Sequence, residues 1–275
     1  AVIAWSLLLT SNMLKAEDKP ATRIIALAPH IVENLYAVGA GELIIGTTEH
    51  ADYPSQALDI PRVGNYARLN IEQILAADAD LIIAWKSGNP SDDLARLKKL
   101  GLNIVYSQPN TLEDVAKELA YLGRLTGNTG QGELKSQQFL AALDQIRTTY
   151  QDKSAISIFY ELWPRPLTTV ANTAWPQQQL AACGGRNPFV DSETDYPQIN
   201  IEQVVLKAPQ VIIQPNSHGV NSPDKVNWQQ WQDIPAVKNN AFVHPNADKL
   251  HRMTSRSLDE LALLCEQVDK FRSFK

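Results

Sequence analysis

The segment N-I-E-Q occurs twice in this chain, at residues 70–73 and again at residues 200–203. When residues 66–83 are aligned with residues 196–213, 7 of the 18 positions are identical. A segment that recurs at a constant offset is typical of a duplicated structural unit. The repeat therefore predicts two lobes of related structure, whereas chance similarity between two strand–helix units is the alternative interpretation.

Each copy of the segment also has the pattern of a helix start. Asn is a favoured N-cap, and a Gln three residues later completes a capping box. The helices are thus predicted to begin just after Asn70 and Asn200, with Glu72 and Glu202 in their first turns. An acid there stabilises a helix by ~0.3–1 kcal/mol, which is reason enough for its presence. The functional alternative is that these matched acids, one in each lobe, engage basic residues of a two-fold symmetric partner.

Short apolar runs alternate with helix-like segments on both sides of the repeat. The runs lie at residues 24–27, 43–46, 81–85, 103–106, 155–160, 211–213 and 241–243. Continuous apolar strands that alternate with helices indicate parallel sheets covered on both faces. Residues 133–150 carry apolar side chains at helical spacing, for a helix ~27 Å long at ~1.5 Å per residue. We therefore expect an α/β protein with two lobes joined by this helix.

The N-terminus has the composition of a targeting segment. Residues 1–10 are apolar apart from Ser6 and Thr10. The run is too short to span a bilayer, which needs ~20 residues. It fits the apolar region of a secretory signal peptide that ends near Ala16. We expect residues 1–16 to be a signal peptide, and a first helix of the fold is the alternative.

Charge and cysteine content narrow the function further. The chain has 25 Lys and Arg against 30 Asp and Glu, a net charge of −5, and shows no basic run. This composition lacks the positive surface that nucleic-acid binding requires. Its two cysteines, Cys183 and Cys265, permit one disulfide in an exported protein. Two buried free thiols are the alternative.

Aromatic residues fall where a ligand would be held. Trp85 ends an apolar strand, and ligand crevices open at such ends in α/β sheets. Tyr66 and Tyr196 directly precede the two helix caps. Three more, expected on loops or at strand ends of the second lobe, are Tyr160, Trp163 and Trp175. Aromatics from both lobes are suited to sandwich a large flat ligand, with ordinary core packing as the alternative. Trp228 and Trp231 are expected to pack a helix at the surface.

Catalytic and metal motifs are missing from the sequence. The five histidines include no pair with the spacing of a zinc site such as H-E-x-x-H. We find no Gly-rich phosphate loop, nucleophile elbow or Cys–His pairing in the chain. We therefore expect no catalytic residues, no metal site and no cofactor. A metal-binding α/β enzyme remains an alternative, but it would need clustered His, Cys and Asp ligands.

Several longer segments carry a family resemblance. They are H-A-D-Y-P (50–54), L-I-I-A-W-K-S-G-N (81–89), C-G-G-R-N-P-F (183–189), Y-P-Q-I-N-I-E-Q (196–203) and D-K-L-H-R (248–252). Over residues 22–269 the chain resembles the periplasmic cobalamin-binding proteins of vitamin uptake ABC transporters. These belong to the long-helix, class III periplasmic binding proteins.

The resemblance implies an architecture and a role. Two Rossmann-like αβ lobes, at residues 22–128 and 153–275, would be joined by a single long rigid helix at residues 129–152. The ligand would be cobalamin or a related corrinoid, bound in the cleft between the lobes. A monomer would carry it through the periplasm to the permease dimer of an ABC transporter in the inner membrane. A haem or ferric-siderophore carrier of the same fold is the alternative, although a siderophore site favours several Arg and Tyr side chains.

The resemblance also assigns roles to residues. It implies that Glu72 and Glu202 dock on permease arginines and that Cys183 and Cys265 form a disulfide. The ligand-binding set is His50, Tyr66, Trp85, Trp163, Tyr196, Asp248, His251 and Arg252. Some of these depart from the family pattern, because His50 replaces a tyrosine and both Tyr66 and Tyr196 replace tryptophans. Imidazole is a common metal ligand, so we hypothesise that His50 reaches the axial position of the cobalt.

Overall fold

Two parallel sheets, one in each lobe, form the framework of the molecule. The computed structural model describes residues 19–216 and 225–273. The first sheet has the order β2-β1-β3-β4 and the second has the order β10-β9-β5-β8. The first is built from β1 (Ile24–Ala26), β2 (Ile44–Thr47), β3 (Leu81–Trp85) and β4 (Ile104–Ser107). The second is built from β5 (Ile156–Tyr160), β8 (Gly185–Arg186), β9 (Val211–Ile213) and β10 (Phe242–Val243). A short antiparallel hairpin, β6 (Trp163–Pro164) and β7 (Leu167–Thr168), extends the second lobe.

The two sheets share one strand arrangement. In the first, β1 pairs with β3 at the centre, and in the second β5 pairs with β9. Read from the opposite edge, β8-β5-β9-β10 repeats the order β2-β1-β3-β4. The two N-I-E-Q segments begin equivalent helices, α2 (Ile71–Ala76) and α7 (Ile201–Lys207), which precede the equivalent strands β3 and β9. The expected two-lobed α/β fold is therefore confirmed.

Burial on both faces explains why the strands are continuously apolar. In the first lobe, alternate strand residues such as Ile24 and Ile83 pack with α1 (Pro29–Ala37) and α4 (Leu112–Leu125). The intervening residues, such as Ile25 and Ile82, pack with α2 and α3 (Ser91–Lys99). Since successive side chains of a strand point to opposite faces, each sheet residue has a helix to pack against. The second lobe uses α6 (Trp175–Ala182), α8 (Pro235–Lys238), α9 (Ala247–Leu250) and α10 (Arg256–Asp269) together with α7.

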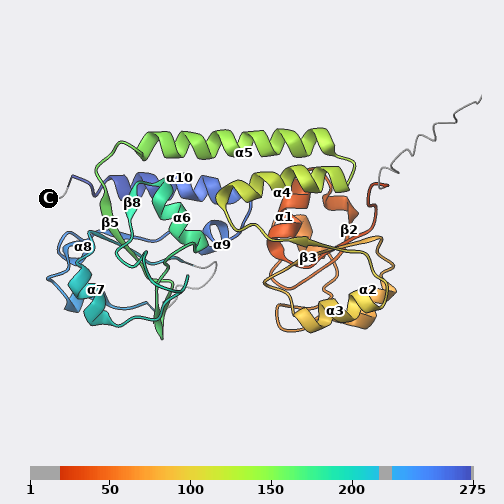
Figure 1. The fold of residues 1–275 in the computed structure, drawn as a ribbon, viewed down its shortest axis with the longest axis horizontal. Helices are drawn as coiled ribbons and strands as arrows, with labels where there is room; N and C mark the ends of the chain where they lie inside the picture. The colour runs from red at the N-terminus through yellow and green to blue at the C-terminus, as the bar shows by residue number, and fades with distance from the viewer. Residues whose placement is uncertain (1–18, 217–224, 274–275) are drawn as a thin grey trace, which may run out of the picture.

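One long helix, α5 (Thr129–Tyr150), runs along both lobes (Figure 1). It begins at Thr129 and so includes Gly130 and Gly132, which precede the 133–150 segment with apolar side chains at helical spacing. A Cβ on Gly132 would lie only 2.8 Å from the Cα of Gly123 in α4, so glycine allows α4 and α5 to approach there.

One local expectation, for Trp228, was wrong. Trp228 is 1 % exposed and belongs to the core, not to a surface helix. Its indole nitrogen donates to Glu161 Oε2 at 2.7 Å, so the buried ring keeps its polar group satisfied.

A disulfide staples the second lobe. Cys183, at the end of α6, is bonded to Cys265 of α10, with their Cα atoms 4.9 Å apart and both side chains fully buried. The expected disulfide is therefore confirmed. Residues 1–16, the expected signal peptide, lie outside the described part of the chain. Within the described part, no helix is both long and apolar enough to cross a membrane.

Candidate functional site

The two matched glutamates lie on the same side of the molecule. Glu72 is in the first turn of α2 and Glu202 is in the first turn of α7, and both are exposed. Figure 1 shows α2 and α7 on the side opposite α5, one in each lobe. The two exposed acids are thus carried by helices on one side of the protein, one from each half. That arrangement suits a partner with two related basic sites.

The caps that place these acids differ between the lobes. In α7 the capping box is complete, because Asn200 Oδ1 accepts from the Gln203 N–H at 2.8 Å and Gln203 Oε1 accepts from the Asn200 N–H at 2.9 Å. In α2 the Asn70 side chain accepts from the Gln73 N–H at 3.1 Å, but the Asn70 N–H donates to the Val63 carbonyl. The predicted box is thus only half formed in α2, because the preceding loop already occupies the backbone donor.

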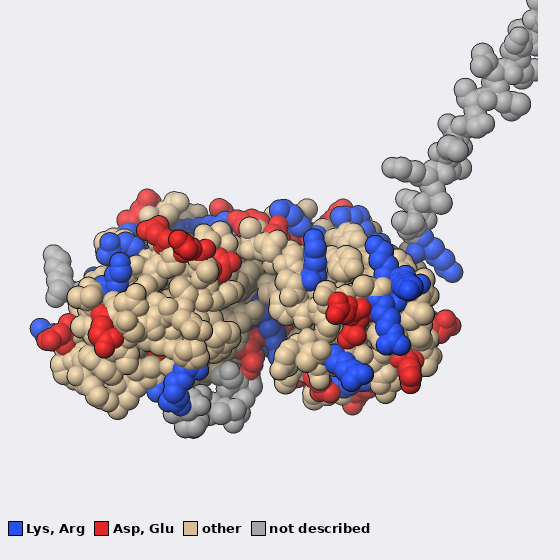
Figure 2. Space-filling model, turned by 60° about the horizontal axis from the view of Figure 1, so that its bottom comes forward, with Lys and Arg blue, Asp and Glu red and all other residues tan. Residues whose placement is uncertain are grey.

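The surface is hollowed between the lobes on the side that carries α2 and α7 (Figure 2). Aromatic residues from both lobes are unusually exposed: Tyr66 at 77 %, Trp163 at 59 % and Tyr196 at 47 %. Within residues 19–216 and 225–273 we find no ring contact that joins these three. They are therefore not core residues, and their exposure leaves their faces open to a ligand.

Trp85 stands on a buried polar support. It is the last residue of β3, and its ring meets the His30 ring edge-on at 5.3 Å. His30 Nε2 lies 2.9 Å from Ser107 Oγ, which in turn donates to Glu118 Oε2 at 2.7 Å. Burial, with the charge of Arg252, lowers the pKa of His30 to about 3, while burial raises the pKa of Glu118 to about 7. The imidazole is thus neutral at physiological pH and packs edge-on against the ring of Trp85.

Trp85 also offers an unused donor. Its indole nitrogen is buried and has no hydrogen-bond partner among the described residues. A buried N–H without a partner costs free energy, so such a group calls for an explanation. At the carboxyl end of a central strand, it is placed where an α/β sheet binds ligands.

His251, which the resemblance assigns to the ligand-binding set, has its imidazole largely buried inside the second lobe. Its Nε2 lies 2.7 Å from the hydroxyl of the fully buried Tyr160. Burial lowers the pKa of His251 to about 4, although the charge of Asp248 acts in the opposite direction. The imidazole is therefore neutral and already paired inside the second lobe. Asp248 lies in the first turn of α9.

His50 and Arg252 are brought together across the lobes. Arg252 Nη2 donates to the His50 carbonyl at 3.3 Å, and the His50 side chain is exposed on a residue with a left-handed φ of 67°. The Arg252 guanidinium also bonds Glu33 Oε1 at 2.8 Å and Asp52 Oδ1 at 2.6 Å. Burial alone would lower the pKa of Arg252, but its hydrogen bonds to these two carboxylates raise it.

Two residues of this interface were missed by the sequence reasoning. Glu33 is 5 % exposed, and Arg256 donates to both of its carboxylate oxygens at 2.6 and 2.8 Å. The signal that was present is an acid within the apolar face of the helix that follows the first strand. A buried acid in such a place requires a charged partner, although the sequence does not say which one.

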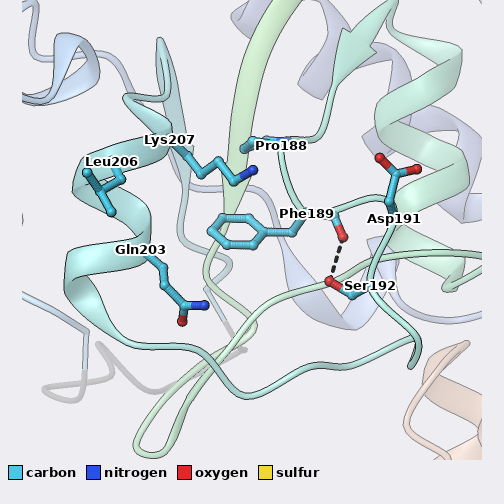
Figure 3. Close-up of a pocket in the computed structure, with 7 residues that line it drawn as sticks. All are labelled: Pro188, Phe189, Asp191, Ser192, Gln203, Leu206 and Lys207. Carbon is cyan, nitrogen blue, oxygen red and sulfur yellow. Dashed lines mark hydrogen bonds between the residues drawn. The ribbon is translucent and has the colours of Figure 1, made fainter.

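A separate pocket opens beside α7 (Figure 3). It has a volume of about 310 Å³ and is lined by Pro188, Phe189, Asp191, Ser192, Gln203, Leu206 and Lys207. Figure 3 shows the Phe189 ring directed toward α7. Leu206 is 83 % exposed at the rim. None of its lining residues is in the predicted ligand set.

The described residues contain no group of three or more His, Cys, Asp or Glu side chains that is placed to hold a metal ion. The polar clusters of the lobe interface are instead ion pairs and hydrogen bonds.

Comparison with known proteins agrees with this geometry. The family described as "Periplasmic binding protein" matches residues 24–248. The Vitamin B12-binding protein of Vibrio cholerae serotype O1 is 41 % identical over 265 residues, which cover 96 % of this chain and 95 % of that protein. The crystal structure of the periplasmic vitamin B12 binding protein BtuF of Vibrio cholerae superposes with a TM-score of 0.84 at 40 % identity, covering 92 % of this chain and 99 % of that one. The periplasmic heme-binding protein RhuT from Roseiflexus superposes with a TM-score of 0.81 at 21 % identity, covering 92 % and 100 %, and so shares the fold.

Proposed function

Because this chain belongs to the periplasmic binding protein family, and has the class III fold of that family, we propose that it captures cobalamin or a related corrinoid between its lobes. It then delivers this cargo to the permease of an ABC transporter. The observation that carries the proposal is the 41 % identity to a vitamin B12-binding protein along nearly the whole of both chains. The family membership also gives the chain its periplasmic location.

The hollow between the lobes supports a large, flat cargo. We propose that Tyr66 of the first lobe, and Trp163 and Tyr196 of the second lobe, contact the faces of the ligand, since all three side chains are exposed. Trp85 adds a rigid ring and a buried N–H donor at a strand end. A corrin ring has large apolar faces and amide-bearing edges, which such aromatic walls and a few polar groups are suited to bind.

Polar contacts complete the proposed ligand set. His50 presents an exposed imidazole, and we propose that it approaches the axial position of the cobalt. Asp248, His251 and Arg252 belong to the second lobe. His251 already bonds Tyr160 and Arg252 already bonds Glu33, so we propose that these two residues hold the site in shape.

We propose that the protein docks on the permease through two glutamates, one in each lobe. Glu72 and Glu202 are exposed on α2 and α7, at the first turns of equivalent helices, so a permease dimer with two related basic sites would meet one acid from each lobe. The protein acts as a monomeric carrier in this scheme. It performs no catalytic step and holds no cofactor of its own, because cobalamin is its cargo.

Haem is the second candidate ligand. The exposed imidazole of His50 favours it, since histidine is a common axial ligand of haem iron. The heme-binding protein RhuT from Roseiflexus, at 21 % identity, shares the fold alone.

Thermal unfolding in the presence of each ligand tests the proposal. A ligand that binds only the folded state stabilises it by about 4 kcal/mol at a concentration 1,000 times its Kd. We expect cyanocobalamin to raise Tm, and hemin and a ferric hydroxamate at equal concentration to leave it unchanged. A rise in Tm with hemin alone would identify haem, and not cobalamin, as the ligand. For His50, the absorbance spectrum of bound aquocobalamin should differ between the parent protein and His50→Ala; identical spectra would remove His50 from the cobalt.

A further inference from the structure

A buried ion cluster connects the two lobes at a place apart from α5. It lies between α1 of the first lobe and residues 252–256 of the second lobe, which lead into α10. Glu33 is at its centre, with a side chain only 3 % exposed. Arg256 forms a two-pronged contact with it, from Nη2 to Oε1 at 2.6 Å and from Nε to Oε2 at 2.8 Å. Arg252 Nη1 adds a third bond to Oε1 at 2.8 Å.

Further contacts surround this centre, and all of them cross between the lobes. Arg252 bonds Asp52 at 2.6 Å and the His50 carbonyl at 3.3 Å. The guanidinium of Arg256 stacks on the Tyr53 ring, 3.6 Å from its centre. The Asn34 amide donates to the Met253 carbonyl at 3.0 Å.

The geometry of these contacts restricts how the lobes can move. The lobes also meet where the Gln178 side chain of α6 donates to the Asn110 carbonyl at 2.7 Å and accepts from the Leu112 N–H at 3.2 Å, so the cluster adds an oriented contact to those that already join them. A guanidinium is a planar fork, so a two-pronged bond to a carboxylate fixes its orientation as well as its distance. Two arginines on one carboxylate therefore define both the separation and the relative tilt of α1 and the start of α10.

Burial makes the cluster specific to one arrangement. The side chains of Arg252 and Arg256 are 14 % and 19 % exposed, and that of Glu33 is 3 % exposed. Exposed ion pairs contribute little, but a buried charge that loses one partner is strongly destabilised. A displacement of one lobe that carries these groups beyond hydrogen-bond distance would leave buried charges without their partners. The cluster thus favours one lobe arrangement over its neighbours.

We propose that Glu33, Arg252 and Arg256 form an interlobe latch that holds the two lobes at a fixed separation, and that they are thereby positioning residues for the ligand between the lobes. The latch itself follows from the ligand-free geometry, whereas its effect on the ligand rests on the proposed function. The latch also changes the role expected for Arg252. Its guanidinium is committed to Glu33, Asp52 and His50, so its main contribution to the site is the width of the cleft.

The test measures lobe separation directly, without any ligand. Spin labels are attached to Lys98→Cys on α3 and Lys207→Cys on α7, two exposed positions in different lobes. The native cysteines are joined in a buried disulfide, so they do not take up label. The distance distribution is then measured by pulsed electron spin resonance in the labelled parent protein and in its variants.

The central variant is Glu33→Gln, which keeps the shape of the side chain and removes its charge. Its distance distribution should be broader than that of the parent protein, with added longer distances. The matched control is Asp269→Asn, because Asp269 also accepts from two cations, Lys153 and Arg272, but within a single lobe. The control should retain the parent distribution. A Glu33→Gln distribution equal to that of the control would overturn the latch.

A milder variant keeps the test informative if Glu33→Gln does not fold. Arg256→Lys retains the charge but loses the fork to Glu33 and the stacking on Tyr53. It should broaden the distribution less than Glu33→Gln does, and an unchanged distribution in folded Arg256→Lys would again overturn the proposal.

Ligand kinetics separate the latch from the proposed function. If the latch positions the ligand, cyanocobalamin should dissociate about tenfold faster from Glu33→Gln, since losses of this kind appear mainly in the dissociation rate. Asp269→Asn should release it at the parent rate. If Glu33→Gln shows a broadened distance distribution but releases cyanocobalamin at the parent rate, the latch sets the lobe separation only. That result would overturn its role in positioning the ligand. Broadened distances with no binding in any protein, the parent included, would instead contradict the cobalamin function and leave the latch standing.

Discussion

The disulfide between Cys183 and Cys265 should be a major source of stability for the second lobe. It closes a loop with a sequence separation of 82. The loop-entropy relation gives about 4.5 kcal/mol for a loop of this length. This is the stabilisation that results because the cross-link lowers the conformational entropy of the unfolded chain. This loop contains β8, α7, β9, α8, β10 and α9, which is most of the second lobe. Both sulfurs are buried, so alanine is the suitable replacement because serine would bury a hydroxyl group.

Urea unfolding of the Cys183→Ala/Cys265→Ala variant measures the effect. We expect the free energy of unfolding to fall by roughly 2–5 kcal/mol, and the slope with urea to rise because the unfolded chain exposes more surface. Hydrogen exchange should accelerate first in β5 and β9, while β1 and β3 of the first lobe keep their protection. A loss below about 1 kcal/mol, or equal acceleration in both lobes, would refute the reasoning, because the loop lies wholly within the second lobe.

Two further predictions concern docking and pH. The double substitution Glu72→Arg with Glu202→Arg should leave cyanocobalamin binding intact and abolish binding to the detergent-solubilised cognate permease, measured by co-purification. Glu133→Arg with Asp144→Arg changes the net charge equally on exposed positions of α5 and should preserve docking; loss of ligand binding in the first variant would mean that its acids line the cleft. For pH, burial lowers the pKa of His251 from 6.5 to about 4, so below pH 6.5 the unfolded state binds the extra proton. His251 should therefore lower the free energy of unfolding by about 1.4 kcal/mol per unit as the pH drops from 6.5 toward 4. Urea unfolding at pH 7 and pH 5 should show a smaller loss in His251→Asn, and equal losses in both proteins would contradict this.

The fold was largely predictable because its signals are local. Apolar runs gave the strands, and the repeated N-I-E-Q segment gave the duplication that the two strand orders share. The apolar spacing did not reach the start of α5, and the bounds 129–152 came from the family resemblance. Gly132 lies inside the helix, and only the close approach of Gly123 in α4 shows why glycine is present there.

The candidate site was predictable only in part. The exposed aromatics and the end of β3 could be located from the sequence, because strand ends and helix caps have local signatures. The latch could not be found, because Glu33 and Arg252 are separated by 219 residues and only the fold brings them together. The burial of Trp228 was missed for a related reason. Its partner Glu161 lies 67 residues away, so nothing nearby marks the ring as a core residue.

Calorimetric titration with cyanocobalamin tests most directly whether the hollow between the lobes binds one cobalamin through Trp85 and the exposed aromatics of both lobes. We predict one binding site per chain with an affinity between the nanomolar and micromolar ranges, and weaker binding in Trp85→Ala at unchanged stoichiometry. If the folded parent protein gives no binding heat at several temperatures and saturating cyanocobalamin leaves its Tm unchanged, this binding is contradicted.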